Sequence, residues 1–415
     1  MPVREAAVLA VGDELLAGAH PDTNTPEIAR TLAPLGIAVR RAALVSDDAE
    51  AIEAAVRELT DHHRLVVVSG GLGPTRDDVT RDGVALAFGR GLIQDEEVAR
   101  GIERFFRGRG MEMAAENMRQ ALFPDGATVL PNRIGTAPGF RLEDGDRALV
   151  CLPGPPAEMR LVLSEEVVRW LTASGRGTDP LPEHRFHLFG LPESVFAAQA
   201  GAWMDRGGEP RMGCSVKRGV LSVTLRAHDA DRERGRALLT RRVAAFRKRF
   251  AGSVFSEEDP LLEHVLGRRL IAEGVRFTCG ESCTGGKVAA LVTAVAGISA
   301  VFGRSFVTYS DEAKVEVLGV DPGLLRRHGA VSREVAEAMA LGAASAAGAR
   351  LSVAVTGIAG PGGATPEKPV GLVWFATALD GAVEACERRF PGQEREWIRT
   401  LAARTALYLA LSRLV

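Results

Sequence analysis

A glycine-rich stretch, Ser69-Gly-Gly-Leu-Gly-Pro-Thr-Arg-Asp-Asp-Val-Thr80, directly follows an apolar run at residues 65–68. Glycines in such a loop let backbone N–H groups approach an anion. Asp77 and Asp78 supply hard oxygen ligands suited to a divalent cation, so the stretch suits a nucleotide diphosphate. On spacing alone, an ordinary strand-to-helix turn capped by Asp78 is an equal alternative. The residues expected to contact the anion are Gly70, Gly71, Gly73 and Thr75.

A second motif, Glu281-Ser-Cys-Thr-Gly-Gly-Lys287, lies between a predicted strand and a predicted helix. The turn would expose the hydroxyl of Ser282, and the helix N-terminus would offer N–H groups to an oxyanion or phosphate. A nucleophilic serine needs a base. Lys314 is a better partner than His264 or His328, because neither histidine lies in a glycine-rich motif and a partly desolvated lysine can act as base.

For three further residues, more than one role is open. Tyr309 could bind substrate or relay a proton, but an aromatic side chain at a core edge is at least as common. Cys283 could be a thiol nucleophile, although a buried spectator cysteine is the commoner outcome. Asp311 lies three residues before Lys314 and would favour the charged lysine. Either Asp311 points to solvent, or Ser299 or Tyr309 shares the catalytic work.

Further glycine-rich segments follow at residues 329–332, 356–363 and 368–371. The loop that begins at Thr356 follows a predicted strand ending at Val355. We therefore expect it at the same sheet edge as Ser282, where two such loops would form a nucleotide pocket.

Strand-like and helix-like segments alternate in both the N-terminal and the C-terminal part, which predicts two α/β domains with parallel sheets. At roughly 150 residues per domain, 415 residues correspond to about 2.8 domains. A turn-rich linker and an alternating strand predict a small α+β domain between the two. The expected boundaries are 1–170, 171–256 and 257–415.

The composition limits the partners. A net charge of −2 provides no global field toward nucleic acid or anionic membranes. The basic helix face at 241–249 is more often solvated than bound to phosphates, so we do not expect nucleic acid. Five dispersed cysteines exclude a disulfide scaffold, and no window reaches the ~20 apolar residues of a membrane helix. We expect a soluble cytoplasmic protein without a membrane partner.

Other motifs surround the first glycine-rich stretch. They are Gly12-Asp-Glu-Leu-Leu16, Asp22-Thr-Asn24, Asp47, Asn117 with Gln120, Asn132 through Gly139, and Leu152-Pro-Gly154. In this order they resemble the CinA family, whose first domain is similar to the molybdopterin-binding fold of MogA and MoaB. The resemblance implies metal-dependent hydrolysis of ADP-ribose to AMP and ribose 5-phosphate. It assigns Asn24 to the substrate, and it assigns Asp13, Glu14, Asp47, Asp77 and Asp78 to a divalent metal of unknown identity.

The C-terminal motifs ESCTGG, Gly297-Ile-Ser299, TYSxxAK, GAVS, TGIAGPxGG and KPVG resemble the deamidase domain of the same family. This resemblance implies hydrolysis of nicotinamide mononucleotide to nicotinic acid mononucleotide and ammonia, without a cofactor. It implies Ser282 as nucleophile, Lys314 as base, and Tyr309 and Ser299 as assisting groups. The implied substrate contacts are Thr284, Gly285, Gly286, Thr356, Gly357 and Arg395, the last in a match that carries one extra residue.

The sequence thus predicts a bifunctional hydrolase of pyridine-nucleotide salvage, and the resemblance implies a homodimer. The alternative is a regulatory protein that binds a nucleotide or molybdopterin, with only one or neither domain catalytically active.

Overall fold

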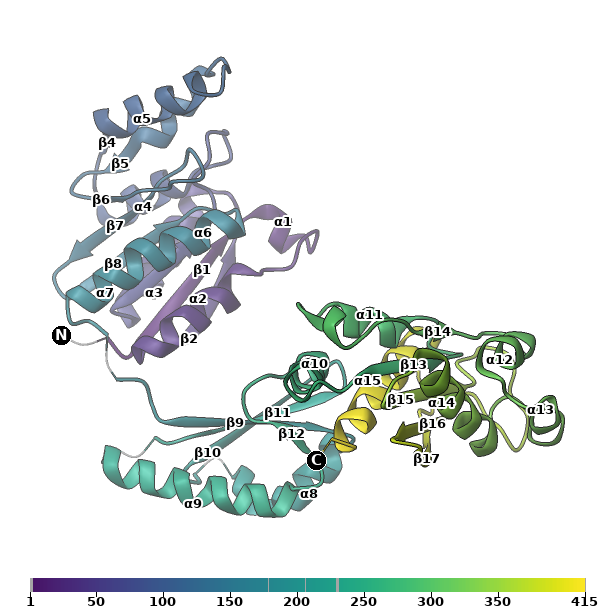
Figure 1. Cartoon of the computed structure of the whole chain (residues 1–415). Helices are drawn as coiled ribbons and strands as arrows, with labels where there is room; N and C mark the ends of the chain where they lie inside the picture. Colours follow the sequence, from purple (N-terminus) through teal and green to yellow (C-terminus); the bar gives the residue numbers. More distant parts are fainter. Residues whose placement is uncertain (1–2, 178, 206, 229–230, 415) are drawn as a thin grey trace. The chain divides into compact units, whose positions relative to one another are not determined.

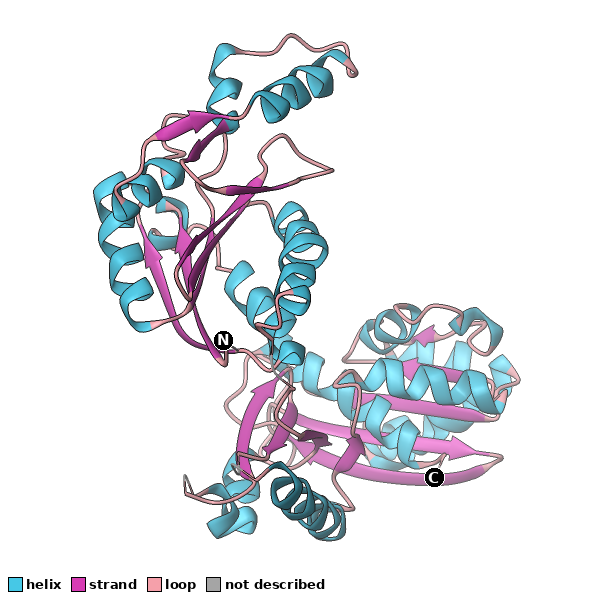
Figure 2. Cartoon of the chain, turned by 90° about the vertical axis from the view of Figure 1, so that its left-hand side faces the viewer, coloured by secondary structure: helices cyan, strands magenta, loops and turns pink. Residues whose placement is uncertain are grey.

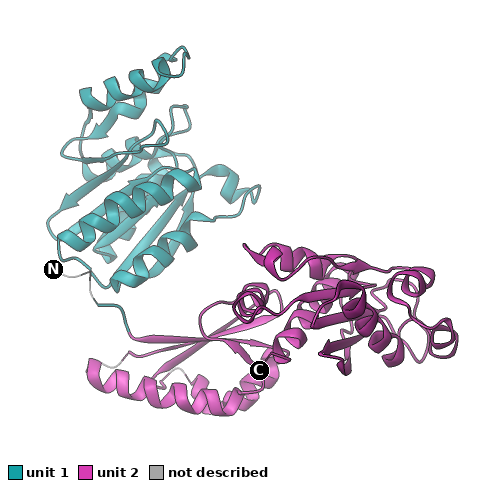
Figure 3. Ribbon diagram, viewed as in Figure 1, with its two compact units in different colours: residues 1–181 teal, residues 182–415 magenta. Residues whose placement is uncertain are grey.

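The computed structural model describes residues 3–177, 179–205, 207–228 and 231–414 (Figure 1). The chain is of the α/β class and divides into two compact units, residues 1–181 and 182–415 (Figure 3). The finer division into three domains stays a prediction. In the described ranges, no helix is long and apolar enough to cross a membrane.

The first unit is built on a six-stranded sheet in the order β2-β1-β3-β8-β7-β6. Strand β3 (Leu65–Ser69) is buried along its whole length. A strand covered on both faces needs apolar residues at every position, and that explains the uninterrupted Leu-Val-Val-Val run. The other strands are β1 (Glu5–Val11), β2 (Ala38–Val45), β6 (Thr128–Leu130), β7 (Gly139–Asp144) and β8 (Arg147–Leu152).

Helices cover both faces of this sheet (Figure 2). Alternate residues of β3 point to opposite faces: Val67 packs in one core with Ile28, and Val68 packs in the other with Ile52. Helices α2 (Asn24–Leu32), α6 (Pro156–Val162) and α7 (Val168–Ala173) line the first core, while α3 (Ala49–His62) and α4 (Thr80–Phe88) line the second.

The sheets of both α/β regions are mixed, and not wholly parallel as predicted. Strands β7 and β8 are antiparallel, as are β16 (Leu372–Leu379) and β17 (Ala382–Arg389). Two-residue connections can join only antiparallel strands. Asp380 and Gly381 both have positive φ, 50° and 87°, as a tight type I′ hairpin turn requires.

The second unit begins with a four-stranded antiparallel sheet in the order β10-β11-β9-β12. Its strands are β9 (Glu183–Phe189), β10 (Arg211–Lys217), β11 (Val220–Arg226) and β12 (Val254–Ser256), and they pack on α8 (Glu193–Ala200) and α9 (Arg232–Phe250). Three basic side chains of α9 have partners within the chain. Arg242 and Arg249 lie 4.7 and 4.3 Å from the Trp203 ring, and Arg247 pairs with Glu257.

A five-stranded sheet, β14-β13-β15-β16-β17, forms the rest of this unit. The parallel strands are β13 (Phe277–Glu281), β14 (Phe306–Val307) and β15 (Leu351–Gly357). One core contains α10 (Leu262–Glu273), α11 (Lys287–Thr293) and α15 (Arg395–Ser412), and the other contains α14 (Arg333–Ala347) with the end of α12 (Asp311–Leu318) and part of α13 (Pro322–His328).

The two sheets of the second unit share a core, because Phe189 of β9 packs among the residues around Leu262 and Phe277. Tyr408 of α15 also donates a 2.7 Å hydrogen bond to the carbonyl of Gly252. Residues 182–415 therefore pack as one body.

Close packing of α14 on α12 gives a stability test. A Cβ at Gly342 would lie 1.9 Å from the carbonyl oxygen of Leu318. We expect Gly342→Ala to lower the free energy of unfolding by about 1–3 kcal/mol, because such overpacking forces the helices apart. Denaturant unfolding of the full chain measures this. In the control Gly101→Ala on α5 (Glu96–Arg107), the nearest atom is 3.9 Å away, so unchanged or increased stability is expected. Equal stability of the two variants would contradict the prediction.

Candidate functional site

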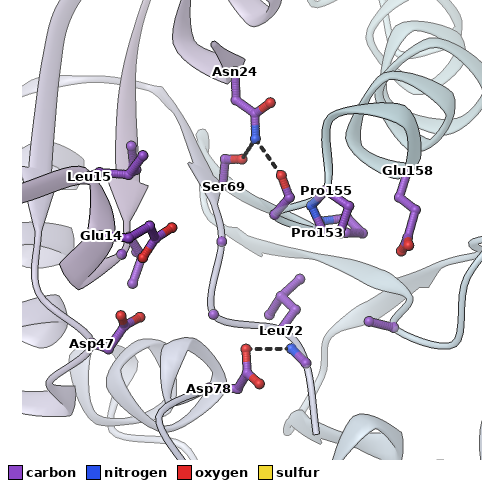
Figure 4. Close-up of a pocket in the computed structure, with 18 of the residues that line it drawn as sticks. Glu14, Leu15, Asn24, Asp47, Ser69, Leu72, Asp78, Pro153, Pro155 and Glu158 are labelled. Atoms are coloured by element: carbon purple, nitrogen blue, oxygen red, sulfur yellow. Dashed lines mark hydrogen bonds between the residues drawn. The ribbon is translucent and has the colours of Figure 1, made fainter. Parts of the chain in front are cut away.

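A pocket of about 760 Å³ opens at the carboxyl ends of the parallel strands in the first unit (Figure 4). Strands β1, β3 and β8 end at Val11, Ser69 and Leu152, and the residues that follow each of them line the pocket. This is the sheet edge at which α/β proteins bind ligands.

The glycine-rich loop lines the pocket, and at two of its positions a side chain would not fit. Gly70 and Gly71 have φ of 110° and 65°, and a Cβ on them would lie 2.3 Å from the Val11 carbonyl oxygen and 2.2 Å from Thr80 Oγ1. The Gly70 N–H donates to the Leu152 carbonyl at 3.1 Å. Over the described residues, the N–H groups of Gly71 and Leu72 have no hydrogen-bond partner, so both are available to an anion.

Asp78 organises this loop from within. Its Oδ1 accepts from the Gly73 N–H at 2.8 Å, and its Oδ2 accepts from the Thr75 N–H at 2.9 Å and from the Thr75 hydroxyl. Both carboxyl oxygens are thus engaged by the loop. Asp78 does not cap α4, because the N-cap position is Val79 and it has no side-chain hydrogen bond. Asp78 and Thr75 instead hold the turn that precedes the helix.

Four further acidic residues, Asp13, Glu14, Asp47 and Asp77, line the same pocket or its edge. The Asp13 N–H donates to Asp47 Oδ2 at 2.8 Å. Burial raises the pKa of Asp47, and the charges of Asp13, Glu14 and Asp77 act in the same direction, against the hydrogen bond from Asp13. Throughout the described chain, none of these four carboxyl groups pairs with a lysine or arginine.

The donor chemistry fits a hard divalent cation, because four carboxyl groups repel one another without a cationic partner. Their spacing is wider than a preformed site needs. Among the described residues, no three His, Cys, Asp or Glu side chains are arranged to hold a metal ion.

Asn24 reaches the pocket from α2. Its Nδ2 donates to Ser69 Oγ at 2.9 Å and to the Gly154 carbonyl at 2.8 Å, which ties α2 to the ends of β3 and β8 (Figure 4). Sequence reasoning missed Glu158 of α6, which lines the same pocket and accepts from Asn132 Nδ2 at 2.6 Å. Its proximity depends on the tertiary fold, and no signal in the sequence marks it.

In the second unit, the predicted meeting of two glycine-rich loops is confirmed. The Ser282 N–H donates to the Val355 carbonyl at 2.9 Å, so Thr356 lies beside the serine at one sheet edge. The Thr356 hydroxyl donates to the Ala330 carbonyl at 2.8 Å. A Cβ at Gly357 would lie 2.7 Å from the Val373 side chain, so this glycine allows close strand packing.

The prediction that the N-terminus of α11 is free to bind an anion is wrong. Glu281 is completely buried, and its carboxyl oxygens accept from the N–H groups of Gly286, Val288 and Ala289 at 2.9–3.0 Å. These are the donors at the start of α11. The protein's own carboxyl group therefore occupies the position that the sequence reserved for a ligand anion.

Lys314 is almost completely buried on α12, near the serine loop. The Thr308 N–H donates to the Glu281 carbonyl at 2.8 Å and brings the two segments together. Lys314 Nζ lies 3.3 and 3.2 Å from the carbonyl oxygens of Tyr309 and Ser310, and 3.5 Å from Asp311 Oδ1. Asp311 is 54% exposed, so it both faces solvent and contacts the lysine.

Two arginines of α15 reach the same loops. Arg395 donates to the Tyr309 hydroxyl at 2.8 Å and to the Gly360 carbonyl, so the structure joins Arg395 to the site despite the extra residue in its motif. Arg399, which sequence reasoning missed, donates to the carbonyl oxygens of Cys283 and Thr284 at 3.2 and 2.9 Å. The sequence could have indicated Arg399, because it lies four residues after Arg395 and such residues share one face of a helix.

Neither Cys283 nor Ser299 is placed as a nucleophile at this site. Burial raises the pKa of the Cys283 thiol to about 12, which disfavours the reactive thiolate. Ser299 is exposed near Val301, whose carbonyl accepts from the Phe277 N–H at the start of β13. Ser282 follows the other end of this strand, about 16 Å away for five residues. The chain does not bring the two serines together.

Comparisons with known proteins agree with the fold. The CinA C-terminal domain family matches residues 260–414, and the probable molybdopterin binding domain family matches residues 7–173. CinA-like proteins of Geobacter sulfurreducens and Anaeromyxobacter dehalogenans are each 42% identical, over 97% and 98% of both chains. A CinA superfamily structure from Klebsiella pneumoniae is 40% identical, with a TM-score of 0.36, and covers 37% of this chain and 95% of its own. With relatives at this identity over nearly its full length, the chain belongs to the CinA family.

Proposed function

We propose that the second unit hydrolyses the carboxamide of nicotinamide mononucleotide, giving nicotinic acid mononucleotide and ammonia. The observation that supports this most is the hydrogen bond from Ser282 N–H to the Val355 carbonyl, which brings the serine loop and the Thr356 loop to one edge beside the Lys314 segment. Small phosphorylated substrates suit such a site, because Arg395 presents a guanidinium next to Tyr309.

In the proposed reaction, Ser282 Oγ attacks the amide carbon and passes its proton to Lys314. The tetrahedral intermediate expels ammonia, which takes up that proton, and leaves an ester on Ser282. Water then cleaves the ester and regenerates the serine. A neutral Lys314 amine keeps two hydrogen bonds and directs a lone pair at the serine, so one of its three present contacts must be released. Among the described residues, Ser299 makes no hydrogen bond with Ser282 or Lys314, so this step gives it no role.

For the first unit we propose metal-dependent hydrolysis of ADP-ribose to AMP and ribose 5-phosphate. The free N–H groups of Gly71 and Leu72 would bind diphosphate oxygens. Asp13, Glu14, Asp47 and Asp77 would hold a divalent cation drawn in with the substrate, and such a cation polarises the diphosphate and lowers the pKa of bound water. Asp78 would act by keeping the loop in shape.

Ser282 is tested by ammonia release from nicotinamide mononucleotide. We expect Ser282→Ala to lower kcat by at least about 10³-fold, since the proposed reaction passes through an ester on Ser282. Chelation should leave the wild-type rate unchanged, because the mechanism uses no metal. A parallel loss in Ser299→Ala would show that this serine assists the reaction. Activity that survives the loss of Ser282 would exclude it as the nucleophile.

A substitution of Asp311 tests whether Lys314 acts as a neutral base. The Asp311 carboxylate lies 3.5 Å from Lys314 Nζ, and this contact is one that the proposed base must release. We expect Asp311→Asn to increase the deamidation rate at neutral pH by up to about fivefold, corresponding to the ~1 kcal/mol of an exposed ion pair. The control Glu316→Gln removes a charge from the same helix without touching Nζ. An unchanged or lower rate in Asp311→Asn alone would argue against a neutral lysine.

The metal is tested with ADP-ribose and chromatographic detection of AMP. We expect chelation to abolish cleavage, and Asp47→Asn to lower it about 10–100-fold with unchanged thermal stability, as loss of a metal-site group does. Glu50→Gln, an exposed neighbour on α3, serves as control. If tight binding of AMP occurs without turnover of either substrate, the chain is a nucleotide-binding regulatory protein.

A further inference from the structure

Nearly every backbone N–H of the serine loop already has an acceptor. Over this fully described segment, from Ser282 to Ala289, only the N–H groups of Cys283 and Thr284 have no hydrogen bond to another residue, and that of Cys283 lies near its own thiol. The two free groups are consecutive and directly follow Ser282. The committed donors are those of Ser282 to Val355, Gly285 to Ser282, Lys287 to Thr284, and Gly286, Val288 and Ala289 to Glu281.

Each free N–H group shares a peptide plane with the carbonyl of the preceding residue, and the hydrogen bond to that carbonyl sets the direction of the N–H group. In a trans peptide the carbonyl and the N–H point in opposite directions. The Ser282 carbonyl accepts from the Gly285 N–H at 3.1 Å, so the Cys283 N–H points away from Gly285. The Cys283 carbonyl accepts from Arg399 Nε at 3.2 Å, so the Thr284 N–H points away from Arg399.

Arg399 is built into this position. Its Nη2 also donates to the Thr284 carbonyl at 2.9 Å, and its Nη1 lies 3.2 Å from Glu396 Oε2. A Cβ at Gly285, whose φ is 57°, would lie 3.1 Å from Nη2, so a glycine leaves room for the guanidinium. Each of its three nitrogens thus has an acceptor in the protein, and these contacts hold the guanidinium in place. A lysine would offer a single nitrogen in place of Nε and Nη2, so it could not reproduce this planar two-nitrogen contact.

We propose that the N–H groups of Cys283 and Thr284 form the oxyanion hole of the amidase site, and that Arg399 is a positioning residue that orients it. This inference rests on the proposed deamidation. When Ser282 Oγ bonds to the amide carbon, the carbonyl π electrons move onto oxygen, and the two N–H groups stabilise that charge. The electrons return when ammonia leaves with the proton taken from Ser282. Neither the Gly285 N–H nor the α11 N-terminus is free to serve.

The test measures steady-state deamidation by full-length Arg399→Lys and Arg399→Gln. Loss of one oxyanion donor costs about 10²–10³-fold in kcat. We expect a fall of about 10²-fold in both variants, with KM within about threefold of wild type. Arg395→Lys should instead raise KM, because Arg395 would contact the substrate phosphate. Thr400→Ala, on the same helix, should change neither constant.

A thioamide analogue of the substrate separates orientation of the hole from a loss of folding. Sulfur accepts poorly from N–H donors, so the wild-type enzyme should turn over the amide much faster than the thioamide. The Arg399 variants should lose most of this preference. An unchanged amide-to-thioamide ratio, or an unchanged kcat, would overturn the role of Arg399 alone. Absence of ammonia release by the wild-type protein would overturn the deamidase function and this inference together.

Discussion

The carboxyl group of Glu281 controls how the second unit presents its chemistry. It is completely buried where β13 ends, and it accepts three backbone N–H groups from the start of α11. Burying an acidic group is costly unless hydrogen bonds compensate for lost water, and these three bonds provide that compensation. The turn between Ser282 and Gly286 therefore has a fixed shape, and Ser282, Arg399 and the Thr356 loop are all placed relative to it.

The first unit uses the same device with another residue. Asp78 binds the Gly73 and Thr75 N–H groups and shapes a loop through which the pocket is formed. In both units an acidic side chain of the motif serves the backbone, and a few N–H groups are left free. In the first loop these belong to Gly71 and Leu72, and in the second to Cys283 and Thr284. Free donors at these two places suit anions: a diphosphate in one case and a transient oxyanion in the other.

Helix α15 joins this chemistry to the rest of the second unit. Its first turns carry Arg395 and Arg399, which contact the Tyr309 segment and the serine loop, while its later turns pack against α10 and contact Gly252 through Tyr408. One buried ion pair, Arg404 with Glu263 at 3.6 Å, lies between these two helices. A displacement of α15 would thus change both the contacts at the site and the packing of the shared core.

The sequence by itself determined the α/β class, the order of the motifs and their placement at strand ends, because hydrophobic periodicity and glycine positions are local properties. It could also have revealed the antiparallel strands, since Asp380-Gly381 is a strong hairpin signal. Only the tertiary structure decided which donor meets which acceptor. Arg399 and Thr284 are 115 residues apart, and their contact depends on how α15 packs against the sheet. Ser282 and Ser299 are close in sequence, but α11 (Lys287–Thr293) lies between them in the chain, and Ser299 lies near the residue that pairs with the start of β13. Spacing along the chain constrains short-range geometry, whereas pairing across a core depends on packing that no local pattern records.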